Sequence, residues 1–254
     1  MRLHPAMMKS GERRVIPFRS ATMSTQIVAQ VREALFAKEL RPGDFLGTEK
    51  HLAERFGVSR IVARDALRTL EAQGIVDIKV GSGGGARISR GNARLFAEAL
   101  AVQLDLTGVS VGEIMEAQRA IEVLAAELAA LNSTAQDHAR LNELNAEAER
   151  RSDDAAAFTR LGREFHLAVA EASHNRVLVV QLISLQHVSW PAQNPTLTPQ
   201  VARRILDTHK ELAALIEMRD AAGARRLMDD HVKMIGARRV AEHRDKREAQ
   251  HDCC

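Results

Sequence analysis

The sequence has few cysteines, few aromatic residues and no long apolar run, and each shortage excludes a class of protein. Its 254 residues include only two cysteines, Cys253 and Cys254, which stand together at the C-terminus. Such a pair builds no disulfide framework, so a reducing, cytoplasmic setting is expected. Tyrosine is absent and aromatic residues make up 3% of the chain, which argues against an all-β fold.

No segment has the length and composition of a membrane span. The longest apolar stretch, residues 177–185, is interrupted by Gln181 and is shorter than the ~20 residues that a bilayer requires. Residues 1–21 are basic but lack the continuous apolar region of a secretion signal, and we interpret them as a flexible basic arm. No membrane partner is therefore expected.

Charge is divided unevenly along the chain, although the whole sequence carries a formal net charge of only +3. Residues 1–94 contain 17 Lys and Arg against 9 Asp and Glu, a balance of +8. The remainder contains 19 against 24, a balance of −5. The first part therefore suits a polyanion such as nucleic acid, whereas the second does not.

The apolar periodicity predicts a winged helix-turn-helix domain over residues 22–89. Two short helices separated by Gly57 follow a longer one, and a glycine-tipped hairpin follows them. That order of elements is typical of proteins that place their third helix in the major groove of DNA. The expected elements are a helix over 22–38, a helix capped by Thr48, a helix from the cap Ser59 to about Gln73, and strands at 75–80 and 86–89 around the tip at 81–85.

Beyond this domain every segment has helical periodicity. A linker over 90–94 is expected to lead to a helical domain over 95–247, followed by a disordered tail over 248–254. The predicted fold class is therefore mainly α, with an all-α antiparallel bundle at the C-terminal side. Seven helices are expected, at 93–106, 111–131, 134–151, 153–172, 176–190, 198–219 and 221–247.

Three arginines at four-residue spacing, Arg60, Arg64 and Arg68, predict a cationic ridge on the third helix. Arg64 is the best candidate for base reading, because a guanidinium fork matches the two acceptors on a guanine edge. Ser59 and Arg60, at the helix N-terminus, are expected to meet phosphate. Further expected DNA contacts are Lys50 and Thr48 at the start of the second helix, and Gly83 in the wing. The alternative is an ordinary solvated helix face.

These residues resemble the GntR-type bacterial regulators. The resemblance is carried by residues 52–60, 63–68 and 70–74, and it extends from the Pro42-Gly43-Asp44 turn to the wing. The helical C-terminal part resembles the FadR-like branch with its FCD effector domain. That resemblance implies a small carboxylate effector bound beside a metal that one acidic residue and three histidines hold. Because a small head is joined to a large helical domain, we also expect a homodimer whose two heads occupy the halves of a palindromic operator.

Three histidines match the ligand positions of that family. Helical periodicity alone directs His209 and His231 to the bundle interior and leaves His166 at the edge of its core face. The resemblance implies that the three hold a divalent transition metal, zinc or nickel. The acidic ligand should lie one turn before His166, where this chain has Gly162. The site is then a three-histidine site completed by water or effector, or it is empty.

Arg119 and Glu122 are the predicted effector-binding residues. The resemblance implies that Arg119 binds the carboxylate of the effector. The alternative is that Arg119 and Glu122, three residues apart, form an ordinary pair within their own helix.

The function that we predict is a sequence-specific DNA-binding transcription regulator, a repressor in preference to an activator, whose operator affinity a small carboxylate modulates. Two alternatives remain: a metal-dependent helical-bundle enzyme and a non-specific architectural DNA-binding protein. Against an enzyme, the sequence has no GxSxG, HExxH or P-loop motif, and residues 171–174 supply a single ExxH where a di-iron bundle needs two. An architectural protein would not explain interior histidines and an interior arginine.

Overall fold

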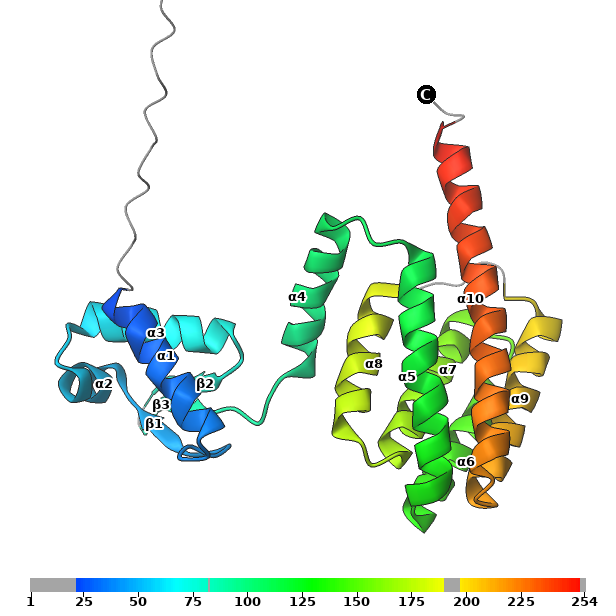
Figure 1. Cartoon of the computed structure of the whole chain (residues 1–254), viewed down its shortest axis with the longest axis horizontal. Coiled ribbons are helices and arrows are strands. Elements are labelled where there is room, and N and C mark those ends of the chain that lie inside the picture. The colour runs from blue at the N-terminus through cyan, green and yellow to red at the C-terminus, as the bar shows by residue number, and fades with distance from the viewer. Residues whose placement is uncertain (1–21, 82, 190–196, 252–254) are drawn as a thin grey trace, which may run out of the picture. The chain divides into compact units, whose positions relative to one another are not determined.

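The computed structural model describes residues 22–81, 83–189 and 197–251, which divide into two compact units at Gly91 and Asn92 (Figure 1). The proposed arm at 1–21 and both cysteines lie outside the described residues. In the N-terminal unit, three helices pack on a small antiparallel sheet with strand order β1-β3-β2. The elements are α1 (Met23–Phe36), β1 (Phe45–Gly47), α2 (Glu49–Phe56), α3 (Arg60–Ala72), β2 (Val76–Lys79) and β3 (Gly85–Ile88).

Side chains with a hydroxyl group cap the N-termini of the three helices of this unit. Thr22, Thr48 and Ser59 each accept a hydrogen bond from the backbone N–H three residues later, at 3.3 Å in every case. Gly57 ends α2 in the left-handed conformation, with a φ of 64°, which glycine adopts without steric cost. The core is aliphatic: it includes Ile27, Val31, Leu52, Ala66, Leu70, Val76 and Ile88. The predicted winged helix-turn-helix fold is confirmed.

One strand of the sheet, β1, was not predicted. Its three residues are too few to show a period, and it pairs with β3 some forty positions later, Phe45 lying opposite Arg87. The predicted hairpin is formed by β2 and β3, in a register that places Val76 opposite Ile88 and Lys79 opposite Gly85.

The C-terminal unit is all-α, as predicted. Within it α5 is central, because it packs against α7, α8, α9 and α10, while α4 packs on α8 (Figure 1). Its core is built largely from alanine, leucine and two phenylalanines, Phe158 and Phe165. The helices are α4 (Ala93–Leu106), α5 (Val111–Asn132), α6 (Ala135–Arg150), α7 (Ala155–Ala172), α8 (Arg176–Ser189), α9 (Pro199–Glu217) and α10 (Ala221–His251).

Two predicted boundaries differ from the structure. Ala93 and Arg94, which fell in both the expected linker and the helix expected at 93–106, form the first turn of α4, because the side chain of Asn92 caps that helix through the backbone N–H groups of Arg94 and Leu95. The disordered tail was predicted from residue 248, but α10 continues to His251. The sequence between 241 and 251 contains no glycine or proline to end the helix.

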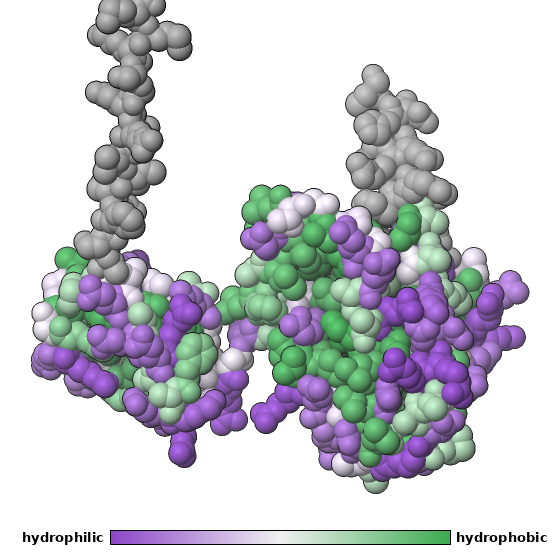
Figure 2. Space-filling view, viewed as in Figure 1, coloured by the Kyte–Doolittle hydropathy of each residue, from purple (hydrophilic) through white to green (hydrophobic). Residues whose placement is uncertain are grey.

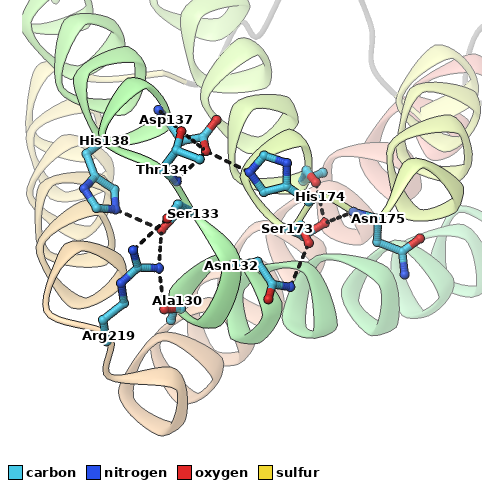
Figure 3. Close-up of polar contacts among 11 residues, drawn as sticks. Ala130, Asn132, Ser133, Thr134, Asp137, His138, Ser173, His174, Asn175 and Arg219 are labelled. Carbon is cyan, nitrogen blue, oxygen red and sulfur yellow. Dashed lines mark hydrogen bonds and ion pairs between the residues drawn. The ribbon is translucent and has the colours of Figure 1, made fainter.

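Polar contacts fasten the helix ends at one side of the bundle (Figure 3). Arg219, in the turn between α9 and α10, donates to the carbonyl oxygens of Ser133 at 2.7 Å and Ala130 at 3.2 Å. A cation thus meets carbonyl groups that the end of α5 leaves unpaired. Asn132 donates to the carbonyl oxygen of Ser173 at 3.1 Å, which ties the end of α5 to the end of α7. The turns are therefore held in place by side chains from neighbouring helices.

Candidate functional site

The solvent face of α3 carries the three predicted arginines. Arg60, Arg64 and Arg68 are exposed, and the opposite side of the helix is buried against the domain core. The cationic ridge therefore exists, on a helix whose orientation the core fixes.

Arg64 is held by a carboxylate from the preceding helix. Its Nε donates to Glu49 Oε1 at 2.8 Å and its Nη2 donates to Glu49 Oε2 at 2.9 Å. The hydrogen bond from Arg64 also holds the pKa of Glu49 below its usual value. This fork uses one edge of the guanidinium and leaves its other N–H groups for a further acceptor. Glu49 thereby orients the candidate base-reading side chain, a role that sequence reasoning missed.

The other predicted DNA contacts lie around the same helix. Thr48 and Ser59 cap α2 and α3 with their hydroxyl groups, and Lys50 is exposed, with its Nζ 3.8 Å from Glu54 Oε1. In the wing Gly83 has a φ of 77°, a conformation that favours glycine. A Cβ on the neighbouring Gly84 would lie 2.4 Å from the carbonyl oxygen of Lys79, so this tight turn requires glycine there.

One apolar side chain lies in the middle of the polar face of α3. Ile61 is 77% exposed, and on a helical projection it falls between Arg64 and Asp65, opposite the buried side. Sequence reasoning had passed it over, because a single exposed apolar residue is common at protein surfaces.

Three histidines meet inside the C-terminal unit. His166 from α7, His209 from α9 and His231 from α10 are all buried, and their ligand atoms lie within 4.8 Å of one another. The Nε2 atom of His231 is 3.1 Å from Nε2 of His209 and 3.3 Å from Nε2 of His166. Below we call these three residues the histidine triad.

Two imidazoles of the triad, those of His209 and His231, are kept neutral by their surroundings. Burial, together with the neighbouring histidines, lowers the pKa of His209 well below its usual value. The same causes, burial first, lower the pKa of His231 to about 3. The ring of Phe165 stacks on that of His209, with centroids 4.2 Å apart. Neutral imidazole is the form that binds metal, so no proton has to be displaced from these two rings.

Glu122 lies directly behind the triad. It is buried, accepts a hydrogen bond from Gln118 Nε2 at 2.6 Å, and contacts Nδ1 of His166 through its other carboxylate oxygen. Because Nδ1 of His166 is occupied, Nε2 is the atom that faces His231. Glu122 therefore positions His166. It does not pair with Arg119, so the alternative of an ion pair between these two residues is wrong.

Arg119 is engaged elsewhere. Its Nε donates to Asp229 Oδ1 on α10 at 2.5 Å, and Lys233 donates to the other oxygen of that carboxylate at 2.6 Å. The sequence placed Arg119 and Glu122 together as effector-binding residues. The structure separates them, because each finds a partner on another helix.

A cavity of about 370 Å³ adjoins the triad. Its polar lining comes from His166 and His209 at the triad, from Thr159 and from three arginines, and its remaining lining is apolar apart from Gly162. Neither Arg119 nor Glu122 belongs to it. The lining residues are Phe158, Thr159, Gly162, His166, Leu197, Val201, Arg204, Ile205, His209, Met234, Ile235, Arg238 and Arg239.

Comparison with known proteins connects these two sites to one kind of molecule. Residues 23–85 match the family described as bacterial regulatory proteins, gntR family, and residues 113–234 match the FCD domain. The Uxu operon regulator of Haemophilus influenzae is 33% identical over 207 residues, which cover 76% of this chain and 73% of that protein. The chain belongs to the GntR family and carries an FCD domain.

Two further similarities agree with this assignment. The Uxu operon transcriptional regulator of Escherichia coli K12 is 29% identical over 223 residues, covering 84% of this chain and 85% of that protein. The solved structure of Streptococcus agalactiae GntR has the same fold, with a TM-score of 0.62 at 22% identity, over 84% of this chain and 99% of that one. The matched families and relatives are transcription regulators, so the prediction that the chain is not an enzyme is confirmed.

The two family matches contain the two sites. The gntR match covers the head from α1 to the start of β3, and the FCD match spans the triad and Glu122. This GntR regulator therefore combines a DNA-binding domain with an effector-binding domain. Among the described residues, no helix is long and apolar enough to cross a membrane.

The residues of the triad fit a metal ion. Zinc bonds of about 2.0–2.1 Å in a tetrahedral site hold neighbouring nitrogens about 3.3–3.4 Å apart, close to the 3.1 and 3.3 Å between the Nε2 atoms. Within the described part of the chain Nδ1 of His231 is buried without a hydrogen-bond partner. No hydrogen bond at Nδ1 therefore turns this ring away from the other two histidines. Gly162 faces the triad: a Cβ there would lie 3.9 Å from Cε1 of His209. A glycine offers no ligand, so the chain supplies three nitrogens and a metal would keep open positions.

Proposed function

We propose that this GntR regulator is a repressor that binds a palindromic operator as a homodimer, and that a small carboxylate bound beside a metal ion in the FCD domain changes its operator affinity. The observation that carries the proposal is the coexistence, in one chain, of an exposed arginine ridge on α3 and a buried histidine triad that opens onto a cavity. A surface for DNA and an interior for a small molecule are what a ligand-responsive regulator needs.

At the DNA, each of the predicted contact residues of the head has a proposed task, and so does Ile61. Arg64, oriented by Glu49, reads a guanine edge in the major groove, and Ile61 contacts a thymine methyl group. Ser59, Arg60, Lys50 and Arg68 bind phosphate, Thr48 adds a hydroxyl contact, and Gly83 lets the wing backbone approach the minor groove. Sequence preference then comes from few residues, and salt-sensitive affinity from many.

In the FCD domain, the cavity is the proposed effector site. Neutral imidazoles, a carboxylate behind one of them and positions left open by Gly162 favour a divalent transition metal, zinc or nickel. Such an ion would attract the carboxylate of an effector. Since Arg119 is paired with Asp229 and does not line the cavity, we assign the anion-binding role to the cavity arginines instead.

A second copy of the chain is the proposed cover for an apolar surface of the FCD domain. Figure 2 shows hydrophobic surface gathered over α4 and α5. The exposed apolar side chains there and on the neighbouring α8 include Phe96, Val102, Leu106, Leu124, Leu131 and Val177. Contiguous apolar surface of this kind is typical of protein interfaces. Two heads then occupy two operator half-sites.

A repressor is the simpler of the two kinds of regulator. Repression needs only occupancy of the operator, whereas activation needs an additional surface for polymerase.

The test is operator binding by the full chain. Duplexes are first selected from a random pool, and fluorescence anisotropy then compares the selected operator with scrambled DNA, with and without a panel of carboxylates and after zinc removal by EDTA. We expect specific binding about 10³-fold or more above scrambled DNA and a shift in affinity with one carboxylate. Equal affinity for the selected operator and for scrambled DNA would indicate an architectural protein. Specific binding that no carboxylate and no metal changes would refute the effector site. In a purified transcription assay, added protein should lower transcript yield from a promoter that contains the operator.

A further inference from the structure

The effector cavity is polar at two ends and apolar between them. One end is the triad, where His166, His209 and Gly162 line the wall. The other end is cationic, because three arginines line it: Arg204 from α9, with Arg238 and Arg239 from α10. Between the two ends, Ile205, Met234 and Ile235 form part of the wall. A ligand that fills this cavity therefore meets two polar regions across a hydrocarbon-like middle.

The two ends are separated along the helices that carry them. Arg238 follows His231 by seven residues on α10, and Arg204 precedes His209 by five residues on α9. Because a short turn makes α9 and α10 antiparallel, both arginines are displaced from the triad in the same direction. At about 1.5 Å per residue the displacement is roughly 7–10 Å, a distance that a chain of several carbon atoms spans.

The charge of the cavity wall has one sign. Every ionised side chain in the lining is an arginine, and no aspartate or glutamate of the described chain belongs to it. Arg239 is buried, with 8% of its surface exposed, so part of this charge lies inside the protein rather than at its rim. Guanidinium groups bind carboxylates and phosphates through charge-assisted, often bidentate hydrogen bonds, and they do so more strongly away from water. An apolar ligand end would desolvate them without offering a partner.

We propose that the effector is a dianionic acid with an aliphatic middle. One anionic group lies at the triad, the second is bound by Arg204 and Arg238, and the hydrocarbon between them packs against Ile205, Met234 and Ile235. This proposal rests on the proposed function, because it takes the cavity as the effector site. It adds a second anion-binding position, which selects diacids over monoacids of the same length.

The test is calorimetric titration of the zinc-saturated full chain with matched acids. Succinate, adipate and suberate are compared with butyrate, hexanoate and octanoate. We expect at least one diacid to bind about tenfold or more tightly than its monoacid partner, because only the diacid places an anion at the arginine end. Arg204→Gln and Arg238→Gln should each reduce this preference severalfold, while monoacid affinity stays the same. The matched control is Arg203→Gln, since Arg203 is an exposed neighbour that does not line the cavity.

The outcomes separate failure of the dianion proposal from failure of the effector site itself. Equal affinity for diacid and monoacid in the unaltered protein would overturn the dianion proposal and leave the effector site in place. A preference that survives in the Arg204→Gln, Arg238→Gln double variant would overturn it as well. If no acid of either series binds, the effector site itself fails together with the proposal. Thermal melting of each variant identifies a loss of fold, and Arg204, which is exposed, gives a variant in which the core is untouched.

Discussion

The two candidate sites of this regulator are built in opposite ways. The arginine ridge that we propose for DNA reading lies on the exposed side of one helix, within the nine positions from Arg60 to Arg68. The histidine triad comes from three helices, and its members are 43 and 22 positions apart, at His166, His209 and His231. The first site is therefore local and exposed, and single substitutions there should change recognition while the fold persists. The second is assembled by the core, so its function and the packing of the bundle are linked.

Loss of one triad histidine should give the largest effect. His209→Ala should reduce zinc affinity by more than about 100-fold, because losing even an outer partner of a metal ligand costs about 10–100-fold and this change removes a ligand. Competition titration against a zinc chelator measures the affinity. His187→Ala, at an exposed histidine of α8, is the control and should leave zinc affinity unchanged. A His209→Ala protein that keeps its zinc would show that the triad is only part of the core.

Replacement of the base-reading arginine should affect specificity alone. Arg64→Lys should weaken operator binding by about 10–100-fold, since a lysine keeps the charge but loses the fork worth about 1–3 kcal/mol. Binding to scrambled DNA and its salt dependence should stay the same. Anisotropy titrations at several salt concentrations separate the two quantities, and Arg55→Lys on α2 is the matched control. An unchanged ratio of operator to scrambled affinity would move base reading to another residue.

Replacing the carboxylate behind the triad by an amide should have an intermediate effect on zinc affinity. Glu122→Gln should lower zinc affinity by about tenfold, because a neutral amide orients His166 but makes its ring a weaker ligand. Chelator competition provides the affinity and thermal melting provides the stability. If melting changes but zinc affinity does not, the role of Glu122 is structural only.

Restoring a fourth ligand should change zinc affinity in the opposite direction. Gly162→Asp should raise zinc affinity on the order of tenfold, since His209 Cε1, at 3.9 Å, is the only described atom beyond the adjoining residues and backbone of α7 that an added Cβ would meet within 4 Å. Gly112→Asp, at an α5 glycine away from the triad, controls for the added charge. No gain at residue 162 would mean that the three histidines already hold the ion as tightly as this geometry allows.

Removal of one methyl contact should give the smallest effect. If Ile61 contacts a thymine methyl, replacing that thymine by uracil should weaken operator binding by about twofold to fivefold, on the order of 0.5–1 kcal/mol. Ile61→Ala protein should not distinguish thymine from uracil at that position. A uracil scan across the selected operator, by anisotropy, tests both statements. Full sensitivity retained in Ile61→Ala would assign the methyl contact elsewhere.

Helix positions and the arginine ridge could be predicted because they depend on neighbouring residues. The α7 helix was expected over 153–172 and is Ala155–Ala172, since a polar cap and an apolar stripe are local signals. Strand β1 was missed because its pairing with β3 is non-local. The alternative that paired Arg119 with Glu122 was wrong for the same reason: the acidic partner of Arg119 is Asp229, which is 110 positions away on α10.

By itself the sequence determined the fold class, the order of the helices and the exposed arginine ridge that we propose faces DNA, because backbone periodicity decides which side chains of a helix face solvent. It also directed His209 and His231 to the interior. Only the tertiary structure decided what those imidazoles meet: Glu122 against His166, Gly162 beside His209, and arginines at the far end of the cavity. The physical reason is that partners of a buried polar group are chosen by packing between helices, which local sequence patterns do not contain.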